Sequence, residues 1–304
     1  MTTAARYAAP LGLAAVFIAF FIATPNFLTP GNIGDLLVSA AILLVLAMGQ
    51  QLVVTVAGID LSVGSNLPWA AAVLGFAYSR GWGLALSILL ALLAGLAVGL
   101  VNGLLIARLN MTDFIVTLGS LSVVSGITLL LTSGNTVPVN SDGLRGLALD
   151  GIGPIRWFWV VAFLVAALVG FLLFRTRTGT YLLATGGNLD AARESGIHVN
   201  RIRLLAYACS GLACGLAAVL FVARTGGSDP SLQTSLLLSS IASVVLGGSS
   251  LFGGRASVLG SVAGAVLLTS LINGFTLLGI SQYYQPIAVG IVVLGAAFIS
   301  RFQR

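Results

Sequence analysis

Long apolar runs, separated by short polar or glycine-rich breaks, cover almost the whole chain. The runs are continuous and lack the period-two alternation of transmembrane β-barrel strands. Most approach the roughly 20 residues that a helix needs to cross a bilayer core. The pattern therefore predicts an all-α fold, a polytopic transmembrane helical bundle of about ten spans forming a single domain over residues 1–304. The expected spans are 8–24, 36–57, 65–79, 82–107, 114–132, 157–174, 204–223, 236–247, 257–277 and 282–300.

Three of these spans depart from a simple crossing helix. The runs 65–79 and 236–247 are the shortest, which predicts half-helices or helices completed by backbone buried within protein. The run 8–24 follows Arg6 and has the length of a signal-peptide core. Because further spans follow and no small-residue cleavage site stands out, we interpret it as an uncleaved first helix.

One polar island, residues 175–203, interrupts the apolar pattern with the sequence RTRTGTYLLATGGNLDAARESGIHVNRIR. Five of the fourteen basic residues lie in it. Basic loops between spans stay on the cytoplasmic side. The island is therefore expected to be a cytoplasmic loop.

The distribution of arginine along the chain fits ten spans with both termini in the cytoplasm. The external loops, including residues 133–156, then receive Arg80, Arg145, Arg156 and Arg224. The cytoplasmic side receives Arg6, Arg108, Arg175, Arg177, Arg193, Arg201, Arg203, Arg255, Arg301 and Arg304.

A short helix with well-marked ends is expected inside the island, at 189–195. Asn188 suits the N-cap, and Asp190 lies in the first turn, where the helix dipole favours an anion. Gly196 suits the left-handed position after the helix, and Ile197 then contacts back toward Ala192.

A helix of about two turns is unstable alone in water. One alternative is that the segment lies on the bilayer surface. Its apolar content, limited to Leu189, Ala191 and Ala192, is too small for strong lipid binding. We therefore expect a protein partner to hold it.

Composition narrows the class of protein. Hydrophobic residues make up 58% of the chain and charged residues 7%, against about 25% charged in soluble domains. All basic residues are arginine, so the chain lacks the lysine of a phosphate-binding P-loop. The arginines are scattered between spans, which favours orientation signals and contacts with membrane lipid over nucleic-acid binding.

Residues for enzymatic chemistry are sparse. Cys209 and Cys214 lie in one apolar run and are interpreted as packing thiols, and His198, the single histidine, as a solvated surface residue. Paired carboxylates and metal-ligand clusters are missing from the sequence pattern. We expect no enzymatic activity, no cofactor and no metal site.

The break Gly58-Ile59-Asp60-Leu61-Ser62-Val63-Gly64-Ser65 places an acid between small residues inside the apolar region. Asp60 can cap the following segment by accepting free backbone N–H groups. It can also line a translocation path, since intramembrane acids are costly and often functional. Both interpretations remain open.

Amides and hydroxyls within the spans suit a path for a neutral polyol or sugar better than one for an ion. The alternative is hydrogen bonding between helices, worth about 0.6 kcal/mol on average. The candidate residues for the path or the helix break are Gln50, Gly58, Asp60, Ser62, Gly64, Ser65, Asn102 and Asn273.

Two features hint at an internal repeat. Asn102-Gly103 and Asn273-Gly274 each close a long apolar helix, and glycine-rich breaks occur at 58–65 and 247–254. Many transporters contain such repeats, but glycine-rich membrane helices also match by chance. Ridges of glycine four residues apart, as at 95–103, predict closely packed helix backbones.

Five segments resemble the membrane permease subunits of bacterial sugar-importing ABC transporters, the ribose/xylose/arabinose/galactoside group. They are MGQQLVVTVAGIDLSVGS (48–65), NGLLIARLNMTDFIVTLGS (102–120), TGTYLLATGGNLDAARESGIHVNRIR (178–203), VVLGGSSLFGGRASVLGSVAGAVLL (244–268) and NGFTLLGISQYYQ (273–285). The resemblance runs from about residue 25 to 300. The chain departs from many members at SLLLSSIAS (235–243) and NMTD (110–113).

The resemblance implies a multi-pass subunit of the bacterial inner membrane that passes a monosaccharide or related polyol. Its implied partners are an ABC ATPase subunit, a periplasmic or lipid-anchored sugar-binding protein, and a second permease chain, identical or different. ATP hydrolysis would occur on the ATPase. The implied ATPase-coupling residues are Gly186, Gly187, Asn188, Asp190, Ala191, Ala192, Arg193, Glu194, Ser195, Gly196 and Ile197.

Two rivals remain open. A proton-coupled secondary transporter using Asp60 or Asp113 would explain the spans and the broken helices. It would not explain a capped helix in a basic loop. A branched-chain amino-acid permease shares the architecture, but the Gly-Ile-Asp-Leu-Ser segment favours the sugar group.

Overall fold

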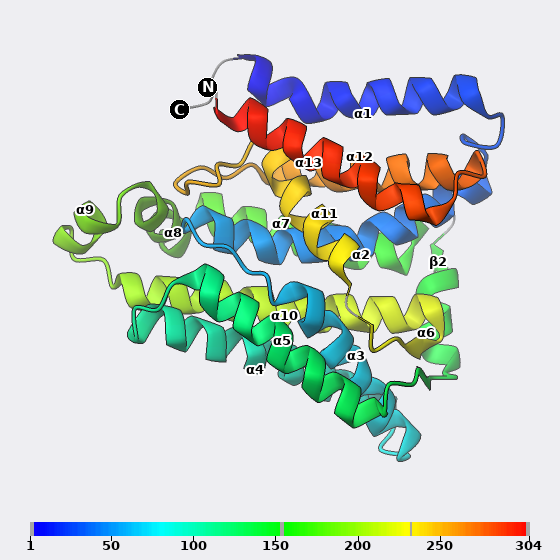
Figure 1. The fold of residues 1–304 in the computed structure, drawn as a ribbon, viewed down its shortest axis with the longest axis horizontal. Coiled ribbons are helices and arrows are strands. Elements are labelled where there is room, and N and C mark those ends of the chain that lie inside the picture. The colour runs from blue at the N-terminus through cyan, green and yellow to red at the C-terminus, as the bar shows by residue number, and fades with distance from the viewer. Residues whose placement is uncertain (1–2, 153–154, 232, 302–304) are drawn as a thin grey trace.

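The protein is described by a computed structural model that covers residues 3–152, 155–231 and 233–301, so Arg304 lies outside the described residues. Apolar helices form the bundle (Figure 1). These are α1 (Thr3–Ala23), α2 (Pro30–Thr55), α3 (Val63–Ser79), α4 (Leu84–Arg108), α5 (Asp113–Thr132), α7 (Trp157–Arg175), α10 (Val199–Thr225), α11 (Thr234–Leu246), α12 (Val258–Leu277) and α13 (Gln285–Arg301).

Shorter elements connect the apolar helices at the two ends of the bundle. The short helices are α6 (Asp142–Leu149), α8 (Arg177–Gly187), α9 (Leu189–Glu194) and the 3-10 turn η1 (Gln282–Tyr284). The strands are β1 (Val137–Pro138), β2 (Gly151–Ile152), β3 (Ile155–Arg156) and β4 (Gly227–Ser228). β1 pairs antiparallel with β4, and β2 with β3.

The all-α, multi-pass architecture expected from the apolar pattern is confirmed. In the described part of the chain, 6 helices are long and apolar enough to cross a membrane: α2, α4, α5, α7, α10 and α12. Each predicted span corresponds to one helix, with ends shifted by a few residues. The number of actual crossings, about ten, stays a prediction.

The two shortest spans are short helices in the structure as well. α3 has 17 residues and α11 has 13. Each follows an extended segment that enters the bundle from one end, so that the helix starts inside the bundle (Figure 1). The backbone N–H of Gln233, just before α11, donates to the carbonyl of Gly64 in the first turn of α3, at 2.9 Å. The N-terminal ends of the two half-helices therefore meet inside the protein.

The helix order describes an inverted repeat. α2, the break 56–62, α3, α4 and α5 are followed later by α10, the break 226–233, α11, α12 and α13, running in the opposite directions (Figure 1). The paired helices have similar lengths. α2 and α10 have 26 and 27 residues, and α3 and α11 have 17 and 13. α4 and α12 have 25 and 20 residues, and α5 and α13 have 20 and 17.

The packing follows the same symmetry, because α10 packs on α3 and α4 while α2 packs on α11 and α12. The repeat hinted at by Asn102 and Asn273 is therefore present, and these residues lie on equivalent helices. The pairing of the break 58–65 with 247–254 is wrong, since its counterpart is 226–233 and 247–254 joins α11 to α12.

Glycine determines how closely α4 and α10 approach. A Cβ added to Gly99 would lie 2.3 Å from the carbonyl oxygen of Tyr207, and one on Gly211 would lie 2.4 Å from that of Gly95. Only hydrogen fits at such contacts. The predicted glycine ridge is thus confirmed as a backbone-to-backbone helix interface.

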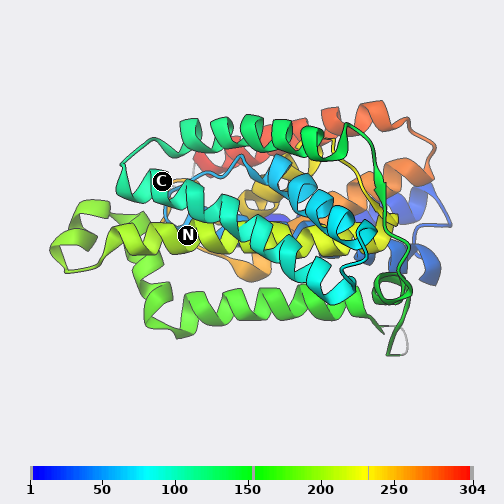
Figure 2. The same cartoon turned by 90° about the horizontal axis from the view of Figure 1, so that it is seen from below.

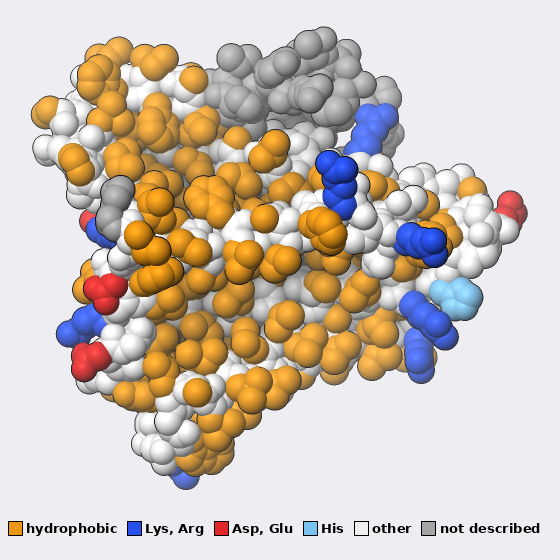
Figure 3. Space-filling view, turned by 180° about the vertical axis from the view of Figure 1, so that it is seen from behind, with side chains coloured by type: hydrophobic (Ala, Val, Ile, Leu, Met, Phe, Trp, Pro, Cys, Tyr) orange, Lys and Arg blue, Asp and Glu red, His pale blue; other side chains and the backbone are white. Residues whose placement is uncertain are grey.

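Charged residues lie mainly at the two ends of the bundle, with a broad apolar band between them (Figure 3). α1 begins and α13 ends at the end that carries α8 and α9 (Figure 1). The described start of α1, the described end of α13 and the polar island therefore lie at the same end of the bundle. Which side is cytoplasmic stays a prediction.

Candidate functional site

The break between α2 and α3 contains one left-handed residue and one close contact with α10. Ala57 has a φ of 59°, in the left-handed region. Gly58 follows, and a Cβ there would lie 2.6 Å from the hydroxyl oxygen of Tyr207 on α10. The chain can therefore turn sharply against α10 only because Gly58 lacks a side chain.

Asp60, in this break, is fully buried and accepts three hydrogen bonds. Its Oδ1 accepts from the backbone N–H of Ser62 at 3.0 Å and from the Ser62 hydroxyl at 2.6 Å. Its Oδ2 accepts from the hydroxyl of Ser210 on α10 at 2.7 Å. Asp60 thus accepts a backbone N–H just before α3, whereas in the described part of the chain no side chain caps the first turn of α3 itself.

The polar cluster around Asp60 extends to two further helices. Asn102 on α4 donates its side-chain amide to the Ser62 hydroxyl at 2.9 Å. Ser120 on α5 donates to the Asn102 side-chain oxygen. The cluster therefore ties the break to α4, α5 and α10, and among the described residues no ion pair neutralises Asp60.

The remaining candidates near this break have different surroundings. Ser65 is buried and donates to the Ser62 carbonyl at 3.1 Å. Gly64 accepts the hydrogen bond from Gln233. Gln50 is fully buried, and within the described residues its side-chain oxygen and nitrogen have no hydrogen-bond partner. A buried amide without partners is costly and points to water or a ligand in another state of the protein.

Gln51, which is not among the candidate residues for the path, makes a second junction. Its Oε1 accepts from the Ser249 hydroxyl at 2.8 Å and from the Ser261 hydroxyl at 2.7 Å. The amide therefore joins α2 to the loop 247–257 and to α12. Ser210 is likewise not among those candidates. Gln51 and Ser210 both lie in mostly apolar helices, and the sequence does not show which neighbouring helix their side chains face.

The short helix of the polar island has the predicted ends. α9 covers Leu189–Glu194, one residue shorter than expected. The Asn188 side chain accepts from the backbone N–H groups of Asp190 and Ala191, at 3.1 and 3.0 Å. Gly196 has a φ of 80°, and Ile197 donates its backbone N–H to Ala192 at 3.0 Å. The left-handed Gly196 and the Ile197–Ala192 bond form a Schellman motif at the C-terminal end of α9.

The rest of the island is more helical than expected. α8 covers Arg177–Gly187, with Thr176 accepting the Gly179 N–H at 3.1 Å, and α10 already begins at Val199. α8 and α9 project from one end of the bundle (Figure 1). Most α9 residues are exposed, whereas Ala192 is buried. The single histidine, His198, is exposed as predicted.

α8 ends on a tight backbone junction. A Cβ on Gly186 would lie 1.9 Å from the carbonyl oxygen of Thr55, at the end of α2. The Gly254 N–H donates to the same Thr55 oxygen at 3.0 Å. The projecting pair α8–α9 therefore rests directly on the end of α2 and on the loop that leads into α12.

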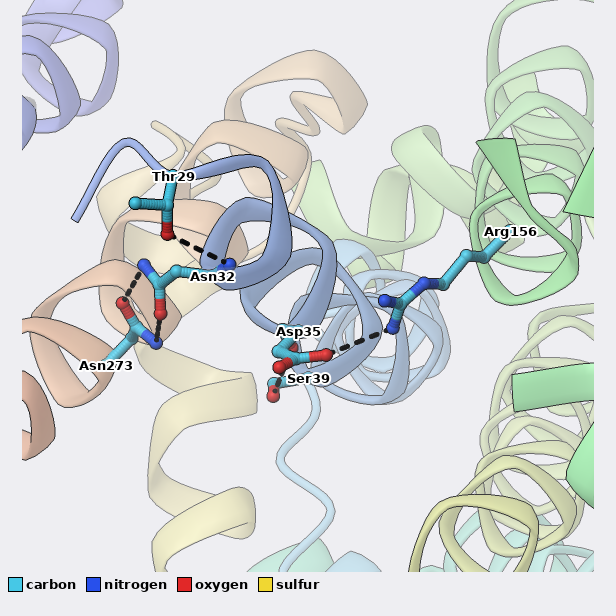
Figure 4. Close-up of polar contacts among 6 residues, drawn as sticks. All are labelled: Thr29, Asn32, Asp35, Ser39, Arg156 and Asn273. Carbon is cyan, nitrogen blue, oxygen red and sulfur yellow. Dashed lines mark hydrogen bonds and ion pairs between the residues drawn. The ribbon is translucent and has the colours of Figure 1, made fainter. Parts of the chain in front are cut away.

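Asn273 does not belong to the Asp60 cluster and lies in a second polar group with Asn32 (Figure 4). Asn273 and Asn32, on α12 and α2, exchange two amide hydrogen bonds, at 3.0 and 2.8 Å. One turn further along α2, Asp35 pairs with Arg156 at 3.1 Å. The structure thus brings Asp60, Ser62 and Asn102 together and places Asn273 in a separate polar group.

Comparison with known proteins identifies relatives over most of the chain. A family model described as branched-chain amino acid transport system, permease component, matches residues 32–299. The ribose import permease protein of Escherichia coli K12 is 37% identical over 283 residues, covering 91% of this chain and 87% of that protein.

Two further relatives are similar. The ribose import permease protein of Bacillus subtilis 168 is 38% identical over 295 residues, covering 96% of this chain and 91% of that protein. The autoinducer 2 import system permease protein of Yersinia enterocolitica is 35% identical over 288 residues, covering 94% and 79%. No solved structure matches the chain.

Proposed function

Because the chain belongs to the family of branched-chain amino acid transport system permease components, we propose that it is the membrane-spanning subunit of an ATP-driven importer in the bacterial inner membrane. The cargo is a monosaccharide or related polyol. The relatives named for ribose and autoinducer 2 import support this choice.

The feature that carries the proposal is the projecting pair α8–α9. A six-residue helix with both ends capped, and with four of its six residues exposed, is too short to be stable alone. Docking of α9 in a cleft of an ATPase subunit would stabilise this short, exposed helix. Movement of α9 would pass through the Gly186–Thr55–Gly254 junction to α2 and α12, on opposite halves of the repeat.

The proposed path runs near the two broken helices, where the N-terminal ends of α3 and α11 meet. Extended backbone at this depth cannot face lipid. α5 and α13 lie along one face of the bundle and α7 on the opposite face (Figure 2). A second permease chain packed on the α5–α13 face would shield the breaks. The candidate residues of this path remain the Asp60 cluster, Gly58, Gly64, Ser65, Gln50 and Asn273.

The experiment is purification of the chain from its native host in mild detergent, with mass spectrometry of the proteins that accompany it. A P-loop ATPase and a sugar-binding protein are expected to co-purify. Isolation of the chain alone, together with sugar uptake that follows the proton gradient and ignores ATP depletion, would contradict the proposal. That result would favour the secondary transporter based on Asp60.

A further inference from the structure

A small cavity of about 290 Å³ opens at the end of the bundle opposite α9, between α2, α10, α11 and α12. Its volume lies just below the roughly 300–1,000 Å³ of most small-molecule sites. Hydroxyls and an amide supply most of its polar lining: Ser39, Ser235, Ser239, Thr269, Asn273 and Thr276.

Helical spacing explains why these groups converge. Asp35 and Ser39 are four residues apart on α2, and Ser235 and Ser239 are four apart on α11. Residues four apart share one face of a helix. Thr269, Asn273 and Thr276 likewise form one stripe on α12. Three polar stripes, from both halves of the inverted repeat, therefore face one small space.

Ser239 marks the inner part of the cavity as a polar site. It is 1% exposed, and its hydroxyl oxygen has no hydrogen-bond partner among the described residues. A buried hydroxyl without a partner costs about 1–3 kcal/mol. A hydroxyl-bearing ligand in the cavity would satisfy it.

The other hydroxyls of the lining can still accept hydrogen bonds. Ser39 donates to the Asp35 carbonyl at 2.9 Å, and Thr269 donates to the Ala265 carbonyl at 2.9 Å. Each proton is thus used within its own helix, while the oxygen lone pairs can still accept a hydrogen bond. Such oxygens suit the O–H donors of a polyol.

Charged groups stand at the mouth of the cavity. Asp35 pairs with Arg156 through Oδ1 (Figure 4). Arg224 also lines the mouth, and no hydrogen bond or ion pair to another described residue holds its guanidinium. The mouth therefore offers a strong acceptor and a free donor to a ligand with several hydroxyls.

Apolar side chains complete the wall: Ile42, Leu43, Phe221, Leu236 and Ile272. A sugar ring has polar edges and apolar C–H faces, and a pocket with both kinds of surface matches it. A lipid chain would leave the polar stripes unpaired.

We propose that this cavity is a monosaccharide-binding site within the permease chain, filled from the outer side before the path opens. The proposal rests on the proposed function and names the place where that substrate first contacts this chain. Ser239 and Arg224 are the residues expected to hydrogen-bond the sugar.

The test is protection of a cysteine by sugar. Ser235 lines the cavity and is exposed, so a thiol at this position can be reached from solvent. The assembled transporter carrying the nearly isosteric Ser235→Cys is reconstituted into ATP-loaded proteoliposomes and treated with a membrane-impermeant thiol reagent. D-ribose, D-xylose and D-galactose are the probes. At least one is expected to slow the reaction several-fold. Asn135→Cys, on an exposed loop outside the cavity, is the matched control and is not protected. Wild-type vesicles give the background from Cys209 and Cys214.

Equal reaction rates with and without every sugar, or no reaction of Ser235→Cys, would overturn the site if wild-type proteoliposomes import sugar on ATP. Failure of the wild type to import any sugar on ATP would instead refute the proposed function, and the site with it. The two failures are thereby distinguished.

A pair of alanine variants provides an independent measurement. Ser239→Ala removes the unpaired hydroxyl, whereas Ser240→Ala removes the adjacent hydroxyl, which donates to the Leu237 carbonyl at 2.7 Å. Binding of the protecting sugar to the purified complex is expected to weaken about fivefold in Ser239→Ala, as for one hydrogen bond. It should be unchanged in Ser240→Ala. Equal affinity of the wild type and both variants would contradict the proposal.

Discussion

At the scale of single residues, Asp60 shows how the protein keeps a carboxylate inside an apolar bundle. Three hydrogen bonds, from Ser62 and Ser210, take the place of a cation. A hydrogen bond between protein groups contributes about 0.5–1.5 kcal/mol to stability. The residue therefore stabilises the break between α2 and α3, whatever part it also plays in a path.

The Ser210→Ala variant should lower the stability of the protein. The change removes the partner of Asp60 Oδ2 and leaves a buried oxygen unpaired, at a cost of about 1–3 kcal/mol. Thermal unfolding in detergent measures it. Ser122→Ala, at an exposed position on α5, is the control and should stay within about 0.5 kcal/mol of the wild type. A wild-type melting curve for Ser210→Ala would contradict the role given to this bond.

At the scale of elements, the C-terminal end of α9 depends on one left-handed residue. Replacing Gly196 with Val should distort this end, because a β-branched residue is strained at a φ of 80°. The proposed docking role then predicts that ATP hydrolysis continues while sugar uptake falls, with normal membrane insertion. Gly196→Asn is the matched control, since asparagine tolerates the left-handed region. Normal uptake in Gly196→Val would count against docking through α9.

The α4–α10 pair depends on glycine for another reason. Gly99→Ala places a Cβ against the Tyr207 carbonyl and should destabilise the fold by about 1–3 kcal/mol, as overpacking does. Gly126→Ala, on α5, meets nothing within 4 Å and is the comparison. The yield of monodisperse protein and its melting temperature measure the difference. Equal yield and melting temperature of the two variants would mean that α4 and α10 can move apart without loss of stability.

At the scale of the whole molecule, the orientation of the bundle can be tested by labelling. If the arginine bias sets the topology, Ser195→Cys beside α9 should react with an impermeant reagent only after the cells are permeabilised. Asn135→Cys, at the opposite end, should react in intact cells. The reverse result would place the polar island outside and would remove the basis for ATPase docking.

Much of this protein follows from its sequence. The spans depend on the length and hydropathy of continuous runs, and the ends of α9 depend on residues within one turn of each other. Such local properties need no knowledge of distant contacts. α8 was missed although Thr176 gives a capping signal, because its small and hydroxyl-bearing residues resemble a loop and its position is held by packing on α7, α10 and α2.

Only the tertiary structure decided how distant polar residues are grouped. Asp60 and Ser210 are 150 residues apart, and Asn32 and Asn273 are 241 apart. The inverted repeat brings these residues together, pairs the break 56–62 with 226–233, and aligns three polar stripes around one cavity. The sequence alone determined which side chains enter the apolar region. Which of these side chains meet is determined by the packing of the helices, because the helix that each side chain faces depends on the whole bundle.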